Sequence, residues 1–508
     1  MSDRPKIPRQ ESLMMPLVRN PFVHKLDLTV GDKIRIAICT VTLFPIRLIL
    51  ILMFLLIAWL LALVALLGIK DELKEPLSGW RRFLRDYPYY FALRAMFFAS
   101  GFHWLRYKGQ KAPSHEAPIA AVAPHSTYTD PLAVFFALSI PTGVGRIETD
   151  STPFVGTLVR ILQPVFVSRN DPNSRQNTIK EIKRRAQSGG KWPQVIIFPE
   201  GTCTNRSCLI SFKGGAFYPG VAVQPVVLRY LTVPDTVTWT WEGPGAYKVL
   251  WLTLCNLNNK LEVEFLPVYK PSEEEIKDPK LFARNVRAVM AEALNVPVTD
   301  HTYEDTRLML QATKTGLPLS AGLVEFQKIR TKLGVTFDSV GNLLDKYAEI
   351  AKSDSDEGID LEDFARYLDL PVSPALKEMF QLYDRDGTGK IDFREYIIGC
   401  SLLTQPANSE ETIQLAFQMF DEGDKGYISQ QELTQILHNA FGMTDTDVAK
   451  LFHNIDQEDS GKITYEQFKS YAEKKPEYAM LFKTYQQMNA VKEATNEQQQ
   501  QGDKVKAE

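Results

Sequence analysis

An uncharged apolar run of 22 residues, Leu48–Ile69, limits the folds open to this chain more than any other feature. As a helix rising about 1.5 Å per residue it reaches roughly 33 Å, enough to cross a hydrocarbon layer of about 30 Å. A shorter apolar piece, Ile36–Phe44, precedes it and is separated from it by Pro45 and Arg47. We therefore expect a membrane segment at residues 34–69. It would be one span or a helix-break-helix hairpin kinked at the proline, with the arginine reaching the lipid headgroups.

Residues 70–107 combine arginines with many aromatic side chains. This composition is typical of amphipathic helices at the headgroup boundary, although the same aromatics would also suit the core of a following domain. Lysines and arginines flank the apolar run on both sides, so the positive-inside rule does not orient it. Residues 1–33 are expected to be a polar N-terminal segment and not a cleaved signal peptide, because the apolar run begins too late and is too long.

The length of 508 residues exceeds what one ordinary core accommodates, so we expect two or three domains. The formal net charge of -3 argues against general nucleic-acid binding, which requires a basic face. The five cysteines are scattered and odd in number, which indicates free thiols in a reducing environment and no disulfide framework. We expect neither a redox cofactor nor a nucleic-acid partner.

Residues 108–310 alternate strand-like apolar runs with helical patterns, which predicts an α/β domain around a central sheet. The expected strands are Ile119–Val122, Pro164–Val167, Val195–Phe198, Val221–Leu228, Thr236–Trp241 and Lys260–Leu266. The expected helices are Pro131–Leu138, Thr178–Gln187 and Leu281–Leu294. Residues 311–344 are expected to form a helical connector.

His125 and Asp130 are a candidate pair for activating a hydroxyl group. Five positions on a regular helix would place them about 140° apart, so they cannot meet there. Pro131 suits the first helical position and disfavours the helical region for the residue before it, which predicts a turn with Asp130 at or near the N-cap. Such a turn can fold the carboxylate onto the imidazole and hold its tautomer. The alternative is that Asp130 is only a cap and His125 a surface residue.

A second motif, Phe198 to Thr202, follows the predicted strand Val195–Phe198 with the sequence Phe-Pro-Glu-Gly-Thr. It lies where ligands collect in α/β sheets, beyond the carboxyl end of a strand. Gly201 permits close approach of a ligand to the backbone. Arg169, which follows another predicted strand, and Lys213 add cations suited to a phosphate. The two motifs together predict a polar site for a phosphate-bearing acceptor beside the histidine.

These blocks, with Val223–Val227 as a fourth, resemble those of the glycerophospholipid acyltransferases related to 1-acylglycerol-3-phosphate acyltransferase, over about residues 115–270. Cys203 after the Glu-Gly-Thr motif, together with a C-terminal calcium loop, is similar to the lysophosphatidylcholine acyltransferases of types 1 and 2. The resemblance implies an α/β acyltransferase domain, preceded by a membrane helix or hairpin and followed by an all-α EF-hand domain.

The resemblance also implies the chemistry. His125 would be the general base that takes the proton from the sn-2 hydroxyl of a lysophospholipid as that oxygen attacks acyl-CoA, and Asp130 would orient it. Arg169, Glu200 and Gly201 would position the glycerophosphate of the acceptor. The complete expected substrate-binding set is Arg169, Glu200, Gly201, Thr202, Cys203 and Lys213. Many members of the family have Arg where this chain has Cys203, and the loss of that cation favours a phosphodiester such as phosphocholine over a phosphomonoester.

Three alternatives stay open at this point. Cys203 could form a covalent acyl-cysteine with His125 as its base, although a thioester is activated enough for direct attack. The acyl donor could be acetyl-CoA and the acceptor an alkyl-lysophospholipid, which would make a platelet-activating lipid. The chain could also be a calcium-binding membrane scaffold with an inactive catalytic domain.

Residues 345–480 contain a loop, Asp384–Glu395, that fits the EF-hand calcium pattern at nearly every position, with Gly389 at the turn. The expected ligands of Ca²⁺ are Asp384, Asp386, Thr388, the backbone carbonyl of Lys390, Glu395 and, through a water molecule, Asp392. Asp421–Glu432 and Asp456–Gln467 keep the loop shape but lose ligands. An upstream remnant at residues 353–363 would complete two pairs of loops.

Residues 481–508 are expected to be a disordered tail, because the chain from Asn496 onward is polar and Gln-rich. Its last residues, with Lys504 and Lys506, resemble a dibasic retrieval signal of endoplasmic-reticulum membrane proteins. Such a signal is read from the cytosol, which favours the hairpin, or at least a cytosolic C-terminus, over a span that places the enzyme in the lumen. The expected location is the endoplasmic-reticulum membrane, with the Golgi membrane and the lipid-droplet surface as further sites. The expected partners are membrane lipid, a lysophospholipid and acyl-CoA. Protein partners stay undetermined.

Overall fold

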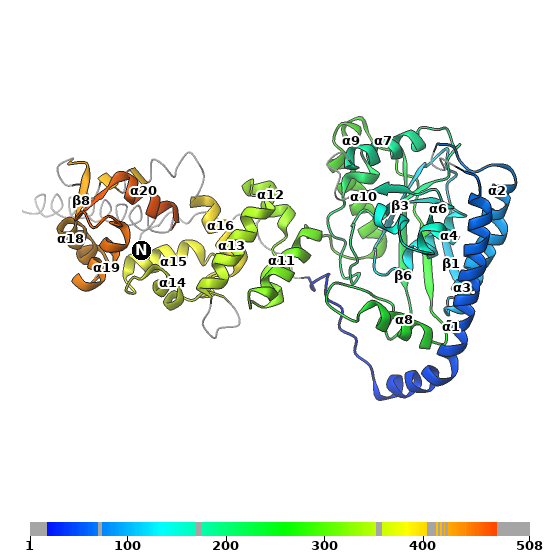
Figure 1. Cartoon of the computed structure of the whole chain (residues 1–508), viewed down its shortest axis with the longest axis horizontal. Helices are drawn as coiled ribbons and strands as arrows, with labels where there is room; N and C mark the ends of the chain where they lie inside the picture. Colours follow the sequence, from blue (N-terminus) through cyan, green and yellow to red (C-terminus); the bar gives the residue numbers. More distant parts are fainter. Residues whose placement is uncertain are drawn as a thin grey trace, which may run out of the picture. The chain divides into compact units, whose positions relative to one another are not determined.

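The computed structural model describes residues 18–69, 74–168, 174–351, 358–403, 413–414, 417–418, 421, 425–441 and 443–474. The chain divides into two compact units, one of residues 16–303 and one that contains residues 304–508 (Figure 1). The segments expected to form a membrane helix and interfacial helices therefore belong to the same unit as the α/β domain. Arg169, residues 353–357 of the upstream loop remnant and the tail from residue 475 onward lie outside the described residues.

A seven-stranded sheet is the centre of the first unit, with strand order β1-β7-β6-β2-β5-β3-β4. Neighbouring strands pair in parallel except β6 and β7, so β1 and β7 run opposite to the other five. The strands are β1 (Leu105–Gly109), β2 (Ile119–Ala123), β3 (Thr142–Arg146), β4 (Val165–Val167), β5 (Val195–Ile197), β6 (Val223–Tyr230) and β7 (Leu261–Phe265). All five residues of β2 are buried, as expected for a central strand covered on both faces. The α/β class is confirmed.

Short helices cover the sheet and connect its strands. They are α4 (Asp130–Leu138), α5 (Ile147–Asp150), α6 (Val155–Arg160), α7 (Ser174–Ala186), η3 (Gly214–Ala216), α8 (Ala246–Cys255), α9 (Glu273–Lys277) and α10 (Pro279–Leu294). The three helices expected in this region correspond to α4, α7 and α10. The expected strand at Thr236–Trp241 is wrong, because this segment is an irregular loop. Its backbone is bonded to the Asp235 side chain and to Ser126 instead of to a neighbouring strand.

The apolar N-terminal segment is one continuous helix, α1 (Val30–Leu66), with Pro45 inside it. Of the two alternatives, the helix-break-helix form is not observed, because the helix continues through the proline. Both halves of α1 pack on the same unit, which holds them in line. Its first half contacts α8 and its second half contacts α3 (Tyr90–Ala99), beside which it runs in Figure 1. By length and composition, α1 is the one helix among the described residues that could cross a membrane.

Arg47 is also placed differently from the expectation that it reaches lipid headgroups. It is 5% exposed, and its guanidinium donates to the backbone carbonyls of Leu254, Asn256 and Leu257 at and beyond the end of α8. Burying a charged side chain is costly unless its donors are satisfied, and these carbonyls satisfy them. The arginine therefore holds α1 against the α/β unit.

The aromatics that follow α1 divide between the two roles that the sequence left open. They lie on α2 (Gly79–Leu84), a π-helical turn η2 (Arg85–Tyr89) and α3. Tyr89, Phe97 and Phe102 are buried in the core, whereas Phe83, Tyr87 and Phe91 are exposed.

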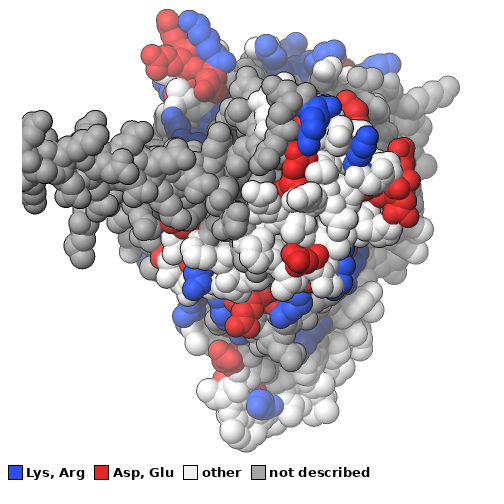
Figure 2. All heavy atoms as spheres, turned by 90° about the vertical axis from the view of Figure 1, so that its left-hand side faces the viewer, with Lys and Arg blue, Asp and Glu red and all other residues white. Residues whose placement is uncertain are grey.

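The second unit is helical and carries paired loops. Its elements are α11 (Tyr303–Lys314), η4 (Leu319–Gly322), α12 (Phe326–Leu333), α13 (Phe337–Ile350), α14 (Leu361–Leu368), α15 (Pro374–Tyr383), α16 (Phe393–Leu403), β8 (Tyr427–Ser429), α18 (Gln430–Phe441), α19 (Asp445–Ile455), β9 (Lys462–Thr464) and α20 (Tyr465–Lys474). A backbone bridge joins Ile359 to Ile391, and β8 pairs antiparallel with β9. The four loops thus pair two by two. In the view of Figure 2, acidic and basic side chains are interspersed among the residues drawn in colour.

Candidate active site

His125 and Asp130 meet in a tight turn after β2. Nδ1 of His125 lies 2.8 Å from Oδ2 of Asp130, and the same oxygen accepts hydrogen bonds from the backbone N–H groups of Ser126 and Thr127. Asp130 is fully buried, and the imidazole side chain is 19% exposed. The carboxylate therefore fixes both the fold of the turn and the orientation of the ring.

The start of α4 explains why the turn has this form. The helix begins at Asp130, with Thr129 as its N-cap and Pro131 in its first turn. Proline has no N–H, so the first turn of the helix contains one fewer donor that needs an acceptor. The Asp130 carboxylate can therefore accept hydrogen bonds from the Ser126 and Thr127 N–H groups, which precede the helix. The side chain thus points back toward His125.

Tyr230 completes the pair from the far end of β6. Its hydroxyl donates to Oδ1 of Asp130 at 2.5 Å, so both carboxylate oxygens of the aspartate are held. Burial raises the pKa of Tyr230 well above its ordinary value, and the negative charge of Asp130 adds to this, so the hydroxyl keeps its proton. The register explains the contact, because Ala123 of β2 is aligned with Val227 of β6 and Tyr230 lies three residues further on.

Arg206 joins the same cluster from the loop that follows the Glu-Gly-Thr motif. Its guanidinium lies 5.2 Å from the Tyr230 ring centroid, donates to the Ser126 hydroxyl at 3.1 Å and pairs with Asp235. Neither Tyr230 nor Arg206 was among the residues expected from the sequence. Each lies in or beside a recognised block, but nothing in the spacing indicates that it would reach the turn at His125.

The pKa of His125 is raised to about 10. Burial alone would lower it, but hydrogen bonds to Asp130 and Cys203 and the charges of these two groups outweigh the burial. These neighbours therefore stabilise the imidazolium, the form that His125 takes once it has accepted a proton.

Glu200 lies inside the protein and contacts the backbone of the His125 turn. It is fully buried, and its Oε2 accepts the backbone N–H of His125 at 2.6 Å. Burial raises the pKa of Glu200 to about 7. Enclosed in this way, the carboxyl group supports the turn from within the protein, and its expected contact with a glycerophosphate stays a prediction.

The other residues of the motif lie around the histidine. The Cys203 side chain is half-buried and bonds to His125, and Thr204 N–H donates to the His125 carbonyl at 2.7 Å. Gly201 has a φ of +66°, and a Cβ there would come within 2.9 Å of the Lys213 side chain. Glycine therefore lets the lysine pass close to the loop.

Two tryptophans contact the loops around His125. The Trp241 indole N–H donates to the Thr202 hydroxyl at 3.1 Å, and the Trp239 backbone N–H donates to the Ser126 carbonyl at 2.8 Å. Lys213 lies 5.3 Å from the Tyr303 ring centroid, and the Trp241 and Tyr303 rings are 5.7 Å apart. Trp239 thus lies beside the turn of the dyad, and Trp241 lies beside the Glu-Gly-Thr motif.

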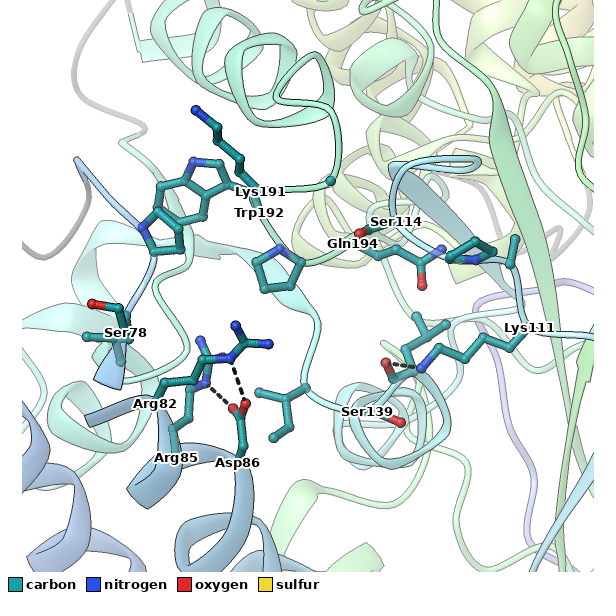
Figure 3. Close-up of a pocket in the computed structure, with 18 residues that line it drawn as sticks. Ser78, Arg82, Arg85, Asp86, Lys111, Ser114, Ser139, Lys191, Trp192 and Gln194 are labelled. Atoms are coloured by element: carbon teal, nitrogen blue, oxygen red, sulfur yellow. Dashed lines mark hydrogen bonds and ion pairs between the residues drawn. The ribbon is translucent and has the colours of Figure 1, made fainter. Parts of the chain in front are cut away.

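A cavity of about 550 Å³ lies at the opposite ends of the strands, lined by residues that precede β2 and β5 (Figure 3). Arg82 and Arg85 share the Asp86 carboxylate there, and Lys111 donates to the Leu138 carbonyl at 2.6 Å. None of the residues expected for the site lines this cavity.

In the second unit, Asp384, Asp386 and Glu395 each place a carboxylate oxygen within 4.8 Å of the others. An all-oxygen set with this spacing suits a hard cation such as Ca²⁺. The hydroxyl of Thr388 donates to the Lys390 carbonyl at 3.1 Å. Burial, followed by the charge of Asp392, raises the pKa of Glu395 to about 7.

The third of the four loops, Asp421–Glu432, contains a lysine where the calcium pattern has an oxygen ligand. Lys425 forms an ion pair with Glu432, the residue at the position of the bidentate calcium ligand. Burial alone would raise the pKa of Glu432, but its bonds to Lys425 and Ser429 hold it at about 2. In the fourth loop, Gln467 accepts a backbone hydrogen bond from Thr464 at 2.9 Å.

The first unit has a mostly parallel sheet, and after its central strand a buried carboxylate orients a histidine. The second unit has paired EF-hand loops. These are the features of an acyltransferase with an EF-hand domain. The sequence matches the family Acyltransferase over residues 105–229, EF hand domain over 375–403 and EF-hand domain pair over 410–473.

Similar curated proteins cover nearly the whole chain. It is 52% identical to "Lysophosphatidylcholine acyltransferase 2" of Danio rerio over 94% of this chain and 90% of that protein. It is 50% identical to the Homo sapiens protein of the same name, over 95% and 88%, and to "Lysophosphatidylcholine acyltransferase 1" of Mus musculus, over 92% and 87%. The chain belongs to the lysophosphatidylcholine acyltransferase family.

Proposed function

We propose that this protein transfers an acyl group from acyl-CoA to the sn-2 hydroxyl of a lysophospholipid, with lysophosphatidylcholine as its acceptor. The observation that carries the proposal is the dyad, in which a fully buried carboxylate holds Nδ1 of His125 at 2.8 Å. The names of the relatives supply the substrate class. The other ring nitrogen of His125 is the group that would take the proton of the acceptor alcohol.

Acyl transfer by this route requires no group beyond the two substrates and the side chains of this protein. His125 accepts the hydroxyl proton while the alcohol oxygen attacks the thioester carbonyl. The tetrahedral intermediate then expels the CoA thiolate, which takes the proton from the imidazolium. Asp130 stabilises the imidazolium between these steps, and Tyr230 and Glu200 hold the aspartate and the backbone of His125 in place. Arg206 and Lys213 are the described cations that would face the acceptor phosphate.

A second route has one observation in its favour, the hydrogen bond between Cys203 and His125. In that route the thiolate accepts the acyl group from CoA and the alcohol then attacks the acyl-cysteine. We propose direct attack, because the thioester carbonyl is already activated. The acetyl-CoA alternative and the inactive scaffold are not favoured, since the relatives are named as acyltransferases and the dyad is complete.

We further propose that α1 attaches the protein to membranes. One side of the helix packs on the catalytic unit, while the other exposes an apolar row that includes Ile38, Ile49 and Leu56. A continuous apolar surface of this kind is unfavourable in water and is stabilised by lipid. The proposed locations are the endoplasmic-reticulum membrane, the Golgi membrane and the lipid-droplet surface.

We propose that Asp384, Asp386, Thr388, Lys390, Glu395 and Asp392 hold Ca²⁺, and that the ion orders the loop without entering the acyl transfer.

The test is acyl transfer from oleoyl-CoA to lysophosphatidylcholine by membranes that contain the full chain or its His125→Ala variant. We expect transfer by the wild type and a loss of at least about 1,000-fold in the variant, because the base is removed. Equal rates in the two membranes would exclude the dyad as the site. Calcium binding, measured on both proteins, serves as the control for folding.

A further inference from the structure

The surface beside the dyad contains a perpendicular pair of aromatic rings, Tyr128 and Trp239. Their centroids are 5.8 Å apart and their planes meet at 71°. Tyr128 lies three residues after the catalytic histidine, and the Trp239 backbone is bonded to Ser126. The rings are therefore fixed to the catalytic turn at two points along the chain.

The Trp239 ring is available to a ligand, and the Tyr128 ring packs against it in a partly buried position. Trp239 is 37% exposed, which is high for a residue that usually buries its large apolar surface. Burial raises the pKa of Tyr128 to about 12, so the phenol stays neutral. Its hydroxyl has no hydrogen-bond partner among the described residues. The two neutral rings meet edge to face at a corner, and a face that the other ring leaves open can attract a weakly hydrated cation.

The charges around this corner complement a zwitterion. Arg206, which donates to the Ser126 hydroxyl, and Lys213 supply positive charge suited to a phosphodiester. The two carboxylates nearest the histidine, Asp130 and Glu200, are fully buried and cannot approach a headgroup. The sn-2 hydroxyl and the sn-3 headgroup are on adjacent carbons of the glycerol, so an acceptor that reacts at His125 places its headgroup near the same turn.

We propose that Trp239 and Tyr128 form the subsite for the trimethylammonium group of a choline headgroup, an assignment that rests on the proposed acyltransferase function. A trimethylammonium group has no N–H to donate and gains most from aromatic faces. An ethanolamine ammonium is strongly hydrated and requires acceptors, and a glycerol headgroup has no positive charge. The pair therefore selects choline-bearing acceptors over acceptors of the same chain length with other headgroups.

The first measurement is the steady-state kinetics of the full chain with oleoyl-CoA and three acceptors: lysophosphatidylcholine, lysophosphatidylethanolamine and lysophosphatidylglycerol. For Trp239→Leu we expect the KM for lysophosphatidylcholine to rise about tenfold, with little change in kcat, in the KM of the other acceptors or in that of oleoyl-CoA. Trp239→Phe should keep most of the preference, because an aromatic face remains. Tyr247→Leu, which removes a 91% exposed aromatic on α8, is the matched control and should behave as the wild type.

A parallel rise for all three acceptors, or no change for any, would overturn the assignment. The second measurement separates this outcome from a failure of the acyltransferase proposal, because it requires no turnover. Equilibrium binding of 2-deoxy-lysophosphatidylcholine, which lacks the reacting hydroxyl, is measured on His125→Ala and on His125→Ala with Trp239→Leu. We expect about tenfold weaker binding in the double variant, and equal binding would contradict the subsite even if the enzyme proves inactive.

Discussion

The Tyr230 hydroxyl and the His125 imidazole hold opposite oxygens of one buried carboxylate, that of Asp130, at 2.5 Å and 2.8 Å. A carboxylate held on both sides cannot rotate. The orientation of His125 therefore depends on Tyr230, which lies 100 positions after Asp130 in the chain. The dyad is in this sense a three-residue arrangement.

Tyr230→Phe removes only the donor to Asp130 and should lower kcat about tenfold, since a hydrogen bond to a charged group contributes roughly 1.5 to 3 kcal/mol. The KM for acyl-CoA should stay unchanged, because the ring and its packing remain. The measurement is kcat of the variant relative to that of the wild type across a range of pH. It distinguishes a role of Tyr230 in positioning the dyad from damage to the fold. A positioning role predicts a shift of the pH profile, and a fold defect predicts a uniform loss. Tyr247→Phe is the control.

The pH dependence of the reaction follows from the raised pKa of His125, about 10. At neutral pH most of the free enzyme carries the imidazolium, and only the neutral fraction accepts a proton. We therefore expect kcat/KM to rise by about tenfold per pH unit from pH 7 to 9 and to level off near the pKa. Asp130→Asn removes the charge that favours the imidazolium, so its weaker activity should level off at lower pH. Profiles that are flat for both proteins would contradict this role.

The same shift affects the stability of the fold. A histidine pKa raised above its unfolded value of about 6.5 stabilises the folded state fully below that pH, and the contribution is lost as the pH rises toward 10. The loss of stability in His125→Gln, measured by thermal unfolding, should therefore be larger at pH 6 than at pH 9.5. An equal loss at both values would show that the imidazolium is not stabilised in the fold.

Cys203→Ala distinguishes direct attack from a covalent acyl-cysteine. We expect activity within a few-fold of the wild type, because the alcohol attacks the thioester itself. The variant also removes one group that raises the pKa of His125, so its pH profile should shift to lower pH. Complete loss of transfer, together with an acylated wild-type intermediate detected by mass spectrometry, would support the covalent route.

Calcium binding should be confined to one loop. Titration calorimetry of the full chain should give one strong site, which Glu395→Gln abolishes. The affinity should increase between pH 6 and 8, because Glu395 with a pKa of about 7 must lose its proton to bind the ion. Glu432→Gln is the matched control and should leave the strong site intact, because Lys425 already neutralises that carboxylate. A second strong site in the wild type would contradict the assignment.

The central strands and the dyad turn could be predicted from the sequence, because Ile119–Val122 and Val195–Phe198 are short apolar runs and Pro131 fixes where α4 begins. Two strands could not. β1 alternates charged residues at a sheet edge, and β3 contains Gly143 and Gly145, which lower its strand propensity.

The parts of the site that the sequence did not predict depend on long-range register. Tyr230 reaches Asp130 only because β6 pairs with β2 and extends beyond it. Glu200 resembles a ligand-binding residue in its motif, but the His125 backbone occupies its carboxylate. The continuity of α1 through Pro45 likewise comes from packing on α3 and α8, which no local pattern encodes.

In the last pair of loops, Asp421–Glu432 and Asp456–Gln467, Lys425 supplies a positive charge from the chain itself. With an ammonium group already bonded to Glu432, the chain itself supplies a cation beside the hairpin of β8 and β9. The preceding pair, joined at Ile359 and Ile391, instead has a cluster of carboxylates that suits a metal ion. The two halves of the appendage would then differ in their response to calcium.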